Sequence, residues 1–141
     1  MIIAIGSDHA GYEYKEQIKK YLEEKGYKTI DVGTHSKDSC DYPDYGHAVG
    51  YLVSKKEADF GVVICSTGEG IMMAANKEKG IRCGIPYNDK VAVLLRKHND
   101  CNVVAFGANQ MRLSTVIRRL EIVLKTRPEF GRHERRRNKI D

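Results

Sequence analysis

The chain has 141 residues, of which 41% are hydrophobic, so it is long enough to bury the core of one domain without metal or disulfide staples. Its formal net charge is +5, and residues 127–141, with six basic and three acidic side chains, contribute +3 of that charge. The remainder is nearly balanced, which argues against a broad nucleic-acid-binding surface. The first residues lack a basic leader and no apolar run could cross a bilayer, so we expect a cytoplasmic protein that does not associate with membranes.

Short apolar runs rich in Ile and Val alternate with segments of helical spacing along the whole chain. In chain order the pattern predicts a strand over 2–5, a helix over 14–25, a strand over 29–32, a helix over 42–56, a strand over 60–65, a helix over 71–79, a strand over 81–85, a helix over 89–97, a strand over 103–106 and a helix over 113–125.

Five such alternations predict parallel strands that are joined by right-handed crossovers. We therefore expect an α/β fold: a doubly wound three-layer sandwich around a five-stranded parallel, Rossmann-like sheet, with its ligand site at the carboxyl ends of the strands. The chain contains no linker or repeat, so we expect one domain over 1–141. Only the basic segment 127–141 differs in composition, and it is expected to be a C-terminal extension that folds onto another surface.

The loop after the third predicted strand, Cys65-Ser66-Thr67-Gly68-Glu69-Gly70, carries the most informative chemistry. A cysteine at a strand end, followed by Thr-Gly-x-Gly and a helix, places a thiol beside backbone N–H groups and the positive end of a helix dipole. These surroundings favour a thiolate. The same N–H groups suit a phosphate or the oxyanion of an enolate. The alternative is that the two glycines only turn the chain and that Cys65 is a packing residue.

Several other chemistries are excluded by residues at decisive positions. The segment from Gly6 to Gly11 has the glycine spacing of a P-loop, but Tyr12 and Glu13 stand where Lys and Ser/Thr are needed. A cysteine-based phosphatase loop needs an Arg at the position of Ile71. The four cysteines have no C-x-x-C spacing, and no cluster of His and carboxylate has metal-site spacing, so we expect reduced thiols and neither a metal nor a cofactor.

Two further groups could act on an anionic substrate. Arg132 and Arg136 are four residues apart, so on a helix they would share a face beside His133 and form a phosphate clamp. The alternative is a solvated basic end. His98 precedes the last strand, at the wrong edge of the sheet for the site within one subunit, and could simply complement the dipole of its helix.

Taken together, several motifs resemble the type B ribose-5-phosphate isomerases, which belong to the wider ribose/galactose isomerase family. The resemblance spans nearly the whole chain, in order. It rests on the opening Gly-Ser-Asp-His-Ala-Gly, on Asp41-Tyr42-Pro43, on the Cys65 loop with Ala74-Ala75-Asn76-Lys77, on His98-Asn99-Asp100-Cys101-Asn102-Val103, on Phe106-Gly107 and on Gly131-Arg132-His133-x-x-Arg136.

The resemblance implies a metal-independent isomerase that interconverts D-ribose 5-phosphate and D-ribulose 5-phosphate through a cis-enediolate. By position, Cys65 would be the base, and Thr67 and the N–H groups of Ser66, Gly68, Glu69 and Gly70 would hold the oxyanion. His98 would be the ring-opening acid and Asn99 a contact to a sugar hydroxyl. Asp8 and His9 would contact the sugar and phosphate, and Arg132 and Arg136, with His133, would hold the phosphate.

The resemblance further implies a homodimer, or a dimer of dimers, in which His98, Asn99 and the tail arginines complete the partner's active site. One position departs from the family pattern: Asn109 stands where many relatives carry an Arg that binds phosphate. This departure leaves open the preference between phosphorylated and free sugars. The alternatives are an isomerase of a six-carbon sugar phosphate or a free aldose, of the galactose-6-phosphate or allose type, and a non-catalytic module that binds sugar phosphates.

Overall fold

The apolar runs of the sequence form the strands of one parallel sheet in the computed structural model, which describes residues 1–141. The strand order is β2-β1-β3-β5-β4, and every neighbouring pair is parallel, as predicted. The elements are β1 (Ile2–Ser7), α1 (Tyr12–Glu24), β2 (Lys28–Gly33), α2 (Tyr42–Ser54), β3 (Phe60–Cys65), α3 (Glu69–Asn76), β4 (Cys83–Gly84), α4 (Asp89–Lys97), β5 (Val103–Gly107), α5 (Leu113–Lys125) and α6 (Arg132–Arg137).

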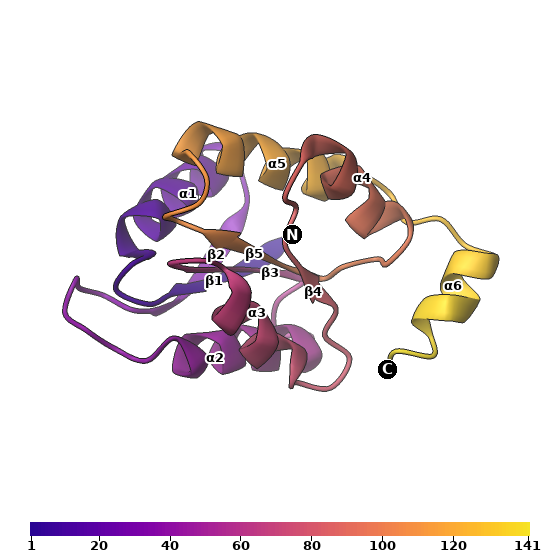
Figure 1. Ribbon diagram of the computed structural model, residues 1–141, viewed down its shortest axis with the longest axis horizontal. Coiled ribbons are helices and arrows are strands. Elements are labelled where there is room, and N and C mark those ends of the chain that lie inside the picture. The colour runs from indigo at the N-terminus through magenta and orange to yellow at the C-terminus, as the bar shows by residue number, and fades with distance from the viewer.

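Helices cover both faces of this sheet, which makes the three-layer sandwich that the alternation predicts (Figure 1). On one face, α1, α4 and α5 bury residues such as Ile18, Ala92 and Val116 against the strands. On the other face, α2 and α3 bury Val49 and Ile71. Because the sheet is covered on both sides, the central strand β3 is buried along its whole length and shows a continuous apolar run instead of an alternating pattern.

The edge strand β4 is shorter than the predicted strand 81–85, and an amide side chain covers its outer edge. The Asn76 amide lies against the outer edge of β4: Nδ2 donates to the carbonyl oxygen of Cys83 at 2.9 Å, and Oδ1 accepts from the Cys83 N–H at 2.8 Å. Just beyond the strand, the Ile85 carbonyl accepts from the N–H of Tyr87 in a turn. Asn76 therefore occupies the hydrogen-bonding positions that a further strand would use, and α3 ends there instead of continuing to 79.

The two central strands position the site. β1 and β3 are neighbours, but the chain leaves β1 toward the face that carries α1 and leaves β3 toward the face that carries α3. The loops after these strands therefore diverge and leave a crevice at the carboxyl edge of the sheet, where doubly wound proteins bind ligands. None of the helices combines the length and the apolar character that crossing a membrane requires.

Candidate active site

The Cys65 loop lies at this edge and connects β3 to α3. Cys65 is the last residue of β3 and is 5% exposed, and its Sγ accepts the backbone N–H of Gly68 at 3.1 Å. Gly68 has a φ of 83° and directly precedes α3, so the loop turns sharply back over the sulfur. The thiol thus lies beside the helix N-terminus with an N–H dipole directed at it, as the sequence predicts.

Glycine contacts fix the position of this loop against the end of β5. A Cβ on Gly68 would lie 2.9 Å from the backbone carbon of Phe106, and one on Gly107 would lie 2.5 Å from the Thr67 carbonyl oxygen. The N–H of Ala108 also donates to the Cys65 carbonyl at 2.9 Å. The glycines therefore do more than turn the chain, because their missing side chains let two loops touch backbone to backbone.

The N–H groups of the loop have different partners, which the sequence could not reveal. The N–H of Gly68 is used by Cys65, and the N–H of Glu69 donates to Thr67 Oγ1 at 3.3 Å. The N–H groups of Ser66, Thr67 and Gly70 make no hydrogen bond within the chain. Fewer N–H donors therefore remain for an anion than the prediction that every N–H from Ser66 to Gly70 is available.

Asn109 contacts this loop directly. Its N–H donates to the Ser66 carbonyl at 3.0 Å and its Nδ2 donates to Ser66 Oγ at 2.7 Å. The side chain that stands in place of an arginine therefore orients the Ser66 hydroxyl.

The other cysteines have different surroundings. Burial raises the pKa of Cys101 to about 12 and that of Cys83 well above its usual value, so both thiols stay protonated in the core. Cys40 is partly exposed, and its Sγ lies 3.9 Å from Nδ1 of His9. Among the buried thiols, only Cys65 combines a strand end, a helix N-terminus and a backbone donor.

The Asp8–His9 segment faces the same crevice, because Ser7 pairs with Ile64 across β1 and β3. Asp8 Oδ1 accepts the N–H groups of Ala10 at 3.0 Å and Gly11 at 3.1 Å, so one carboxylate oxygen builds the turn. His9 Nδ1 accepts the N–H of Cys40 at 3.2 Å. This bond fixes the tautomer with the proton on Nε2, where His9 can donate to an anion.

The second predicted group gathers at a different place. His98 follows α4 and stacks on His133 with ring centroids 3.9 Å apart and an angle of 9° between the planes. Arg132 and Arg136 are exposed beside them. A cavity of about 420 Å³ is lined by His98, Asn99, Arg132, His133, Arg136, Arg137 and Ile140. The structure thus brings His98, Asn99 and the tail side chains together, although they come from separate segments.

His133 was expected to lie beside the phosphate-binding face of Arg132 and Arg136. It is instead only 8% exposed and packs on the His98 ring. Burial lowers the pKa of His133, and the charges of His98 and Arg132 lower it further. His98, His133 and Glu129 hold their potential ligand atoms within 4.8 Å of one another. The two rings are nearly parallel, so their lone pairs do not converge on one point, and a metal ion could bind only if one ring turned.

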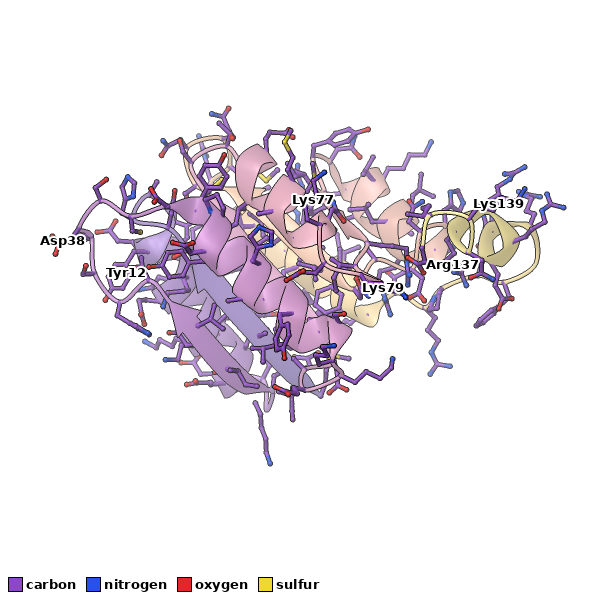
Figure 2. The ribbon with its side chains drawn as sticks, turned by 90° about the horizontal axis from the view of Figure 1, so that it is seen from below. Tyr12, Asp38, Lys77, Lys79, Arg137 and Lys139 are labelled. Carbon is purple, nitrogen blue, oxygen red and sulfur yellow. The ribbon has the colours of Figure 1, made fainter.

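The two groups lie at opposite ends of the sheet. The Cys65 loop packs on Gly107 at the end of β5, whereas His98 and Asn99 precede Val103 at its start, and five residues of strand span about 13 Å. In Figure 2, Asp38 in the loop that contacts His9 and Lys139 after α6 mark opposite ends of the molecule. One chain alone therefore does not bring the tail arginines to Cys65.

Two arginines that hold the second group were missed by the sequence analysis. Arg137 is 5% exposed and donates to the carbonyls of Glu129 at 2.7 Å and His98 at 3.5 Å, with its guanidinium over the Phe130 ring. Arg82 contacts the loop that follows His98. A usable signal existed for Arg82, because a charged residue inside the apolar run 81–85 needs a buried partner.

Comparisons with known proteins show which family the chain is similar to. The sequence model of the Ribose/Galactose Isomerase family matches residues 3–140. Ribose-5-phosphate isomerase B of Escherichia coli (strain K12) is 43% identical over 137 residues, which cover 95% of this chain and 90% of that protein.

Two solved structures are similar over nearly the whole fold. Ribose-5-phosphate isomerase B of Clostridium thermocellum has a TM-score of 0.98 at 44% identity, covering 99% of this chain and 95% of that chain. The Mycoplasma genitalium ribose-5-phosphate isomerase B with bound ribulose-5-phosphate has a TM-score of 0.94 at 37% identity, covering 99% of this chain and 93% of that chain. The chain belongs to the ribose/galactose isomerase family, as its motifs predict.

Proposed function

We propose that this protein interconverts D-ribose 5-phosphate and D-ribulose 5-phosphate, with Cys65 as the base. The observation that carries the proposal is the Cys65 sulfur, which accepts the Gly68 N–H at 3.1 Å at the N-terminus of α3. An N–H directed at the sulfur stabilises negative charge there. Membership of the family, and a relative that holds ribulose-5-phosphate, support the substrate.

In the proton-transfer step, the Cys65 thiolate removes the proton from C2 of the open-chain aldose. The electron pair moves to the C1 oxygen and forms a cis-enediolate. The C2 hydroxyl proton then passes to the adjacent C1 oxygen, and the thiol returns its proton to C1 as the C2 carbonyl forms. The free N–H groups of Ser66, Thr67 and Gly70 are the donors available to the developing oxyanion. No step in this scheme requires a metal.

The ring-opening step requires an acid at the sugar ring oxygen, and His98 is the candidate. It would donate a proton to that oxygen as the bond to C1 breaks, while the C1 hydroxyl loses its proton and becomes the aldehyde. The phosphate would be held by His9 through Nε2 and by the exposed guanidinium groups of Arg132 and Arg136.

These contributions come together only if two chains share each site. The separation of Cys65 from His98 along the sheet supports a homodimer in which His98, Asn99 and the segment 127–141 of one protomer complete the site of the other. A dimer of dimers would preserve the same arrangement. The four cysteines are unpaired, which suits the reducing cytoplasm that we propose as the site of this reaction.

The test is to mix the purified protein with ribose 5-phosphate in chelator-treated buffer and to follow ribulose 5-phosphate. Cys65→Ala should lower the rate by about 10²–10⁴-fold, the usual contribution of a general base, without lowering the melting temperature. Cys83→Ala is the matched control, because it removes a thiol that burial keeps protonated.

Four other outcomes would change this assignment. Conversion of galactose 6-phosphate but not of ribose 5-phosphate would assign a six-carbon substrate, and conversion of unphosphorylated sugar alone would assign a free aldose. Tight binding without conversion would make the protein a binding module. Equal conversion by the parent and Cys65→Ala would keep the isomerase and remove Cys65 as its base.

A further inference from the structure

One guanidinium group holds the loop that follows His98. Arg82 Nε donates to the carbonyl of Asn99 at 2.8 Å and to that of Asp100 at 3.2 Å, and its Nη2 donates to the Asp100 carbonyl at 3.0 Å. Nη1 donates to Asp141 Oδ2 at 2.8 Å. The Arg82 side chain is only 16% exposed, so these bonds are partly shielded from water.

The backbone of Arg82 is fixed as well. Its N–H donates to Asn102 Oδ1 at 2.8 Å, and its carbonyl accepts the Asn102 N–H at 3.1 Å. The Asn102 amide also donates to the Gly80 carbonyl at 2.9 Å. The guanidinium therefore projects from an anchored segment, and its contacts restrict the loop and not only the arginine.

The loop needs such support because its backbone is unusual. Asp100 has a φ of 45°, a left-handed conformation that few residues with a side chain adopt. Besides the Arg82 bonds, Arg96 Nη1 contacts Asp100 Oδ1 at 2.8 Å and the Cys101 carbonyl at 2.7 Å. Two arginines from opposite sides thus hold the turn that sets the direction of His98 and Asn99.

Arg82 also connects this loop to the C-terminal segment. A cavity of about 430 Å³ is lined by both, with Asn99 and Cys101 from the loop region and Ile140 and Asp141 from the C-terminal segment. In Figure 2, Lys79 and Arg137 both lie toward the end of the molecule that carries Lys139. The Arg82–Asp141 contact joins the two sides of this cavity, so it links the His98 loop to the helix that carries Arg132 and Arg136.

We propose that Arg82 is a positioning residue for ring opening: it fixes the 98–100 loop so that His98 is directed at the sugar ring, and it couples that loop to the phosphate-binding tail. This inference rests on the proposed function. Arg82 itself touches neither the substrate nor Cys65 in this scheme, so its loss should impair ring opening and spare the proton transfer.

The two steps can be measured separately. Ribose 5-phosphate is mainly a ring, whereas ribulose 5-phosphate stays open because its phosphate blocks the hydroxyl that would close the ring. Isomerisation of ribose 5-phosphate therefore reports both steps. Incorporation of deuterium from D₂O at C1 of ribulose 5-phosphate reports the Cys65 step alone.

With saturating substrate, Arg82→Met should lower kcat from ribose 5-phosphate by about 10²-fold, as expected for a misplaced catalytic group. Deuterium exchange into ribulose 5-phosphate should stay close to the parent rate. Arg82→Lys should fall between, because an ammonium keeps the charge but cannot reach both carbonyls and Asp141 in fork geometry. Arg118→Met is the matched control, since Arg118 pairs with Asp89 between α4 and α5 and is 52% exposed.

Equal losses in both assays, or an unchanged kcat from ribose 5-phosphate, would overturn the proposal. Backbone amide exchange over residues 98–101 gives a second measurement: it should accelerate in Arg82→Met, and unchanged protection would also overturn the proposal. If the parent converts neither sugar phosphate, the proposed function fails and ring opening by His98 fails with it. The amide measurement then still decides whether Arg82 holds the loop.

Discussion

The Cys65 loop and the His98 loop are held in place by opposite means. At the Cys65 loop, the backbones of Thr67 and Gly107 touch because glycines lack side chains, and the N–H groups of Gly68 and Glu69 bond within the loop. At the His98 loop, long arginine side chains reach the carbonyls, Arg82 from the segment before β4 and Arg96 from the adjoining helix α4. The Cys65 loop is held by backbone contacts within its own chain. The His98 loop, by contrast, lies beside exposed arginines, a stacked histidine pair and a cavity.

This difference indicates that the two halves of the proposed site meet different demands. A base that removes a carbon-bound proton needs fixed geometry, which backbone contacts provide. A group that reaches a neighbouring protomer must project from the edge of its own fold, where side-chain contacts are the available restraints.

Subunit complementation is the sharpest test. Cys65→Ala and His98→Asn should each lose about 10²–10⁴-fold in activity. If two chains share each site, unfolding and refolding an equal mixture should restore about one quarter of the parent activity, because half of the dimers would then contain one intact site.

The matched control is a mixture of Cys65→Ala with Thr67→Ala, since both changes fall in the same half-site and leave no site intact. No recovery in verified heterodimers of the first pair would contradict a shared site and place the whole reaction within one chain.

Two glycines with positive φ allow a direct comparison of the Cys65 loop with the C-terminal segment. Gly68 (φ 83°) abuts the backbone of Phe106, whereas Gly131 (φ 71°), before α6, has open space around it. Alanine at either position should cost about 1–3 kcal/mol in backbone strain. Only Gly68→Ala should also displace the loop and lower kcat, by about 10²-fold. Thermal melts and kinetics on both variants measure this, and equal kinetic losses would contradict the contrast.

The stacked pair should make stability depend weakly on pH. The pKa of His133 is lowered from 6.5 by burial and by the charges of His98, Arg132 and Arg136, against an opposing contribution from Glu129. The unfolded chain therefore binds a proton more readily, so stability should fall as the pH drops below 6.5.

Denaturant unfolding between pH 7.5 and 5.5 checks this effect. His133→Asn should flatten the pH dependence, whereas His47→Asn, on an exposed part of α2, should leave it unchanged. A slope that His133→Asn leaves unaltered would assign the pH dependence to other groups.

Much of the fold follows from local patterns. The run 60–65 is apolar at every position, which is the pattern of a strand that is covered on both faces. The burial of β3 could therefore be predicted from the sequence alone. The Cys65 loop was also predictable, since strand, thiol, glycines and helix are consecutive in the sequence. The grouping of His98 with Arg132 and Arg136 came from the resemblance to the family, because no local pattern joins residues so far apart.

What could not be predicted are contacts between segments without periodicity. The cover on the outer edge of β4 depends on Asn76, whose amide bonds to Cys83 only once the chain has folded back. The bond of Asn109 to Ser66, the stack of His133 on His98 and the Arg82 contacts depend on side-chain directions that spacing does not encode.

The Asn76 amide has a consequence for how copies of this protein can meet. An open sheet edge invites another strand, and repeated pairing of that kind leads to fibres. At β4, one planar side chain already satisfies the donor and the acceptor of Cys83, so an incoming backbone would have to displace it. Repeated strand pairing at this edge is therefore disfavoured, and closed complexes formed through side-chain contacts are favoured.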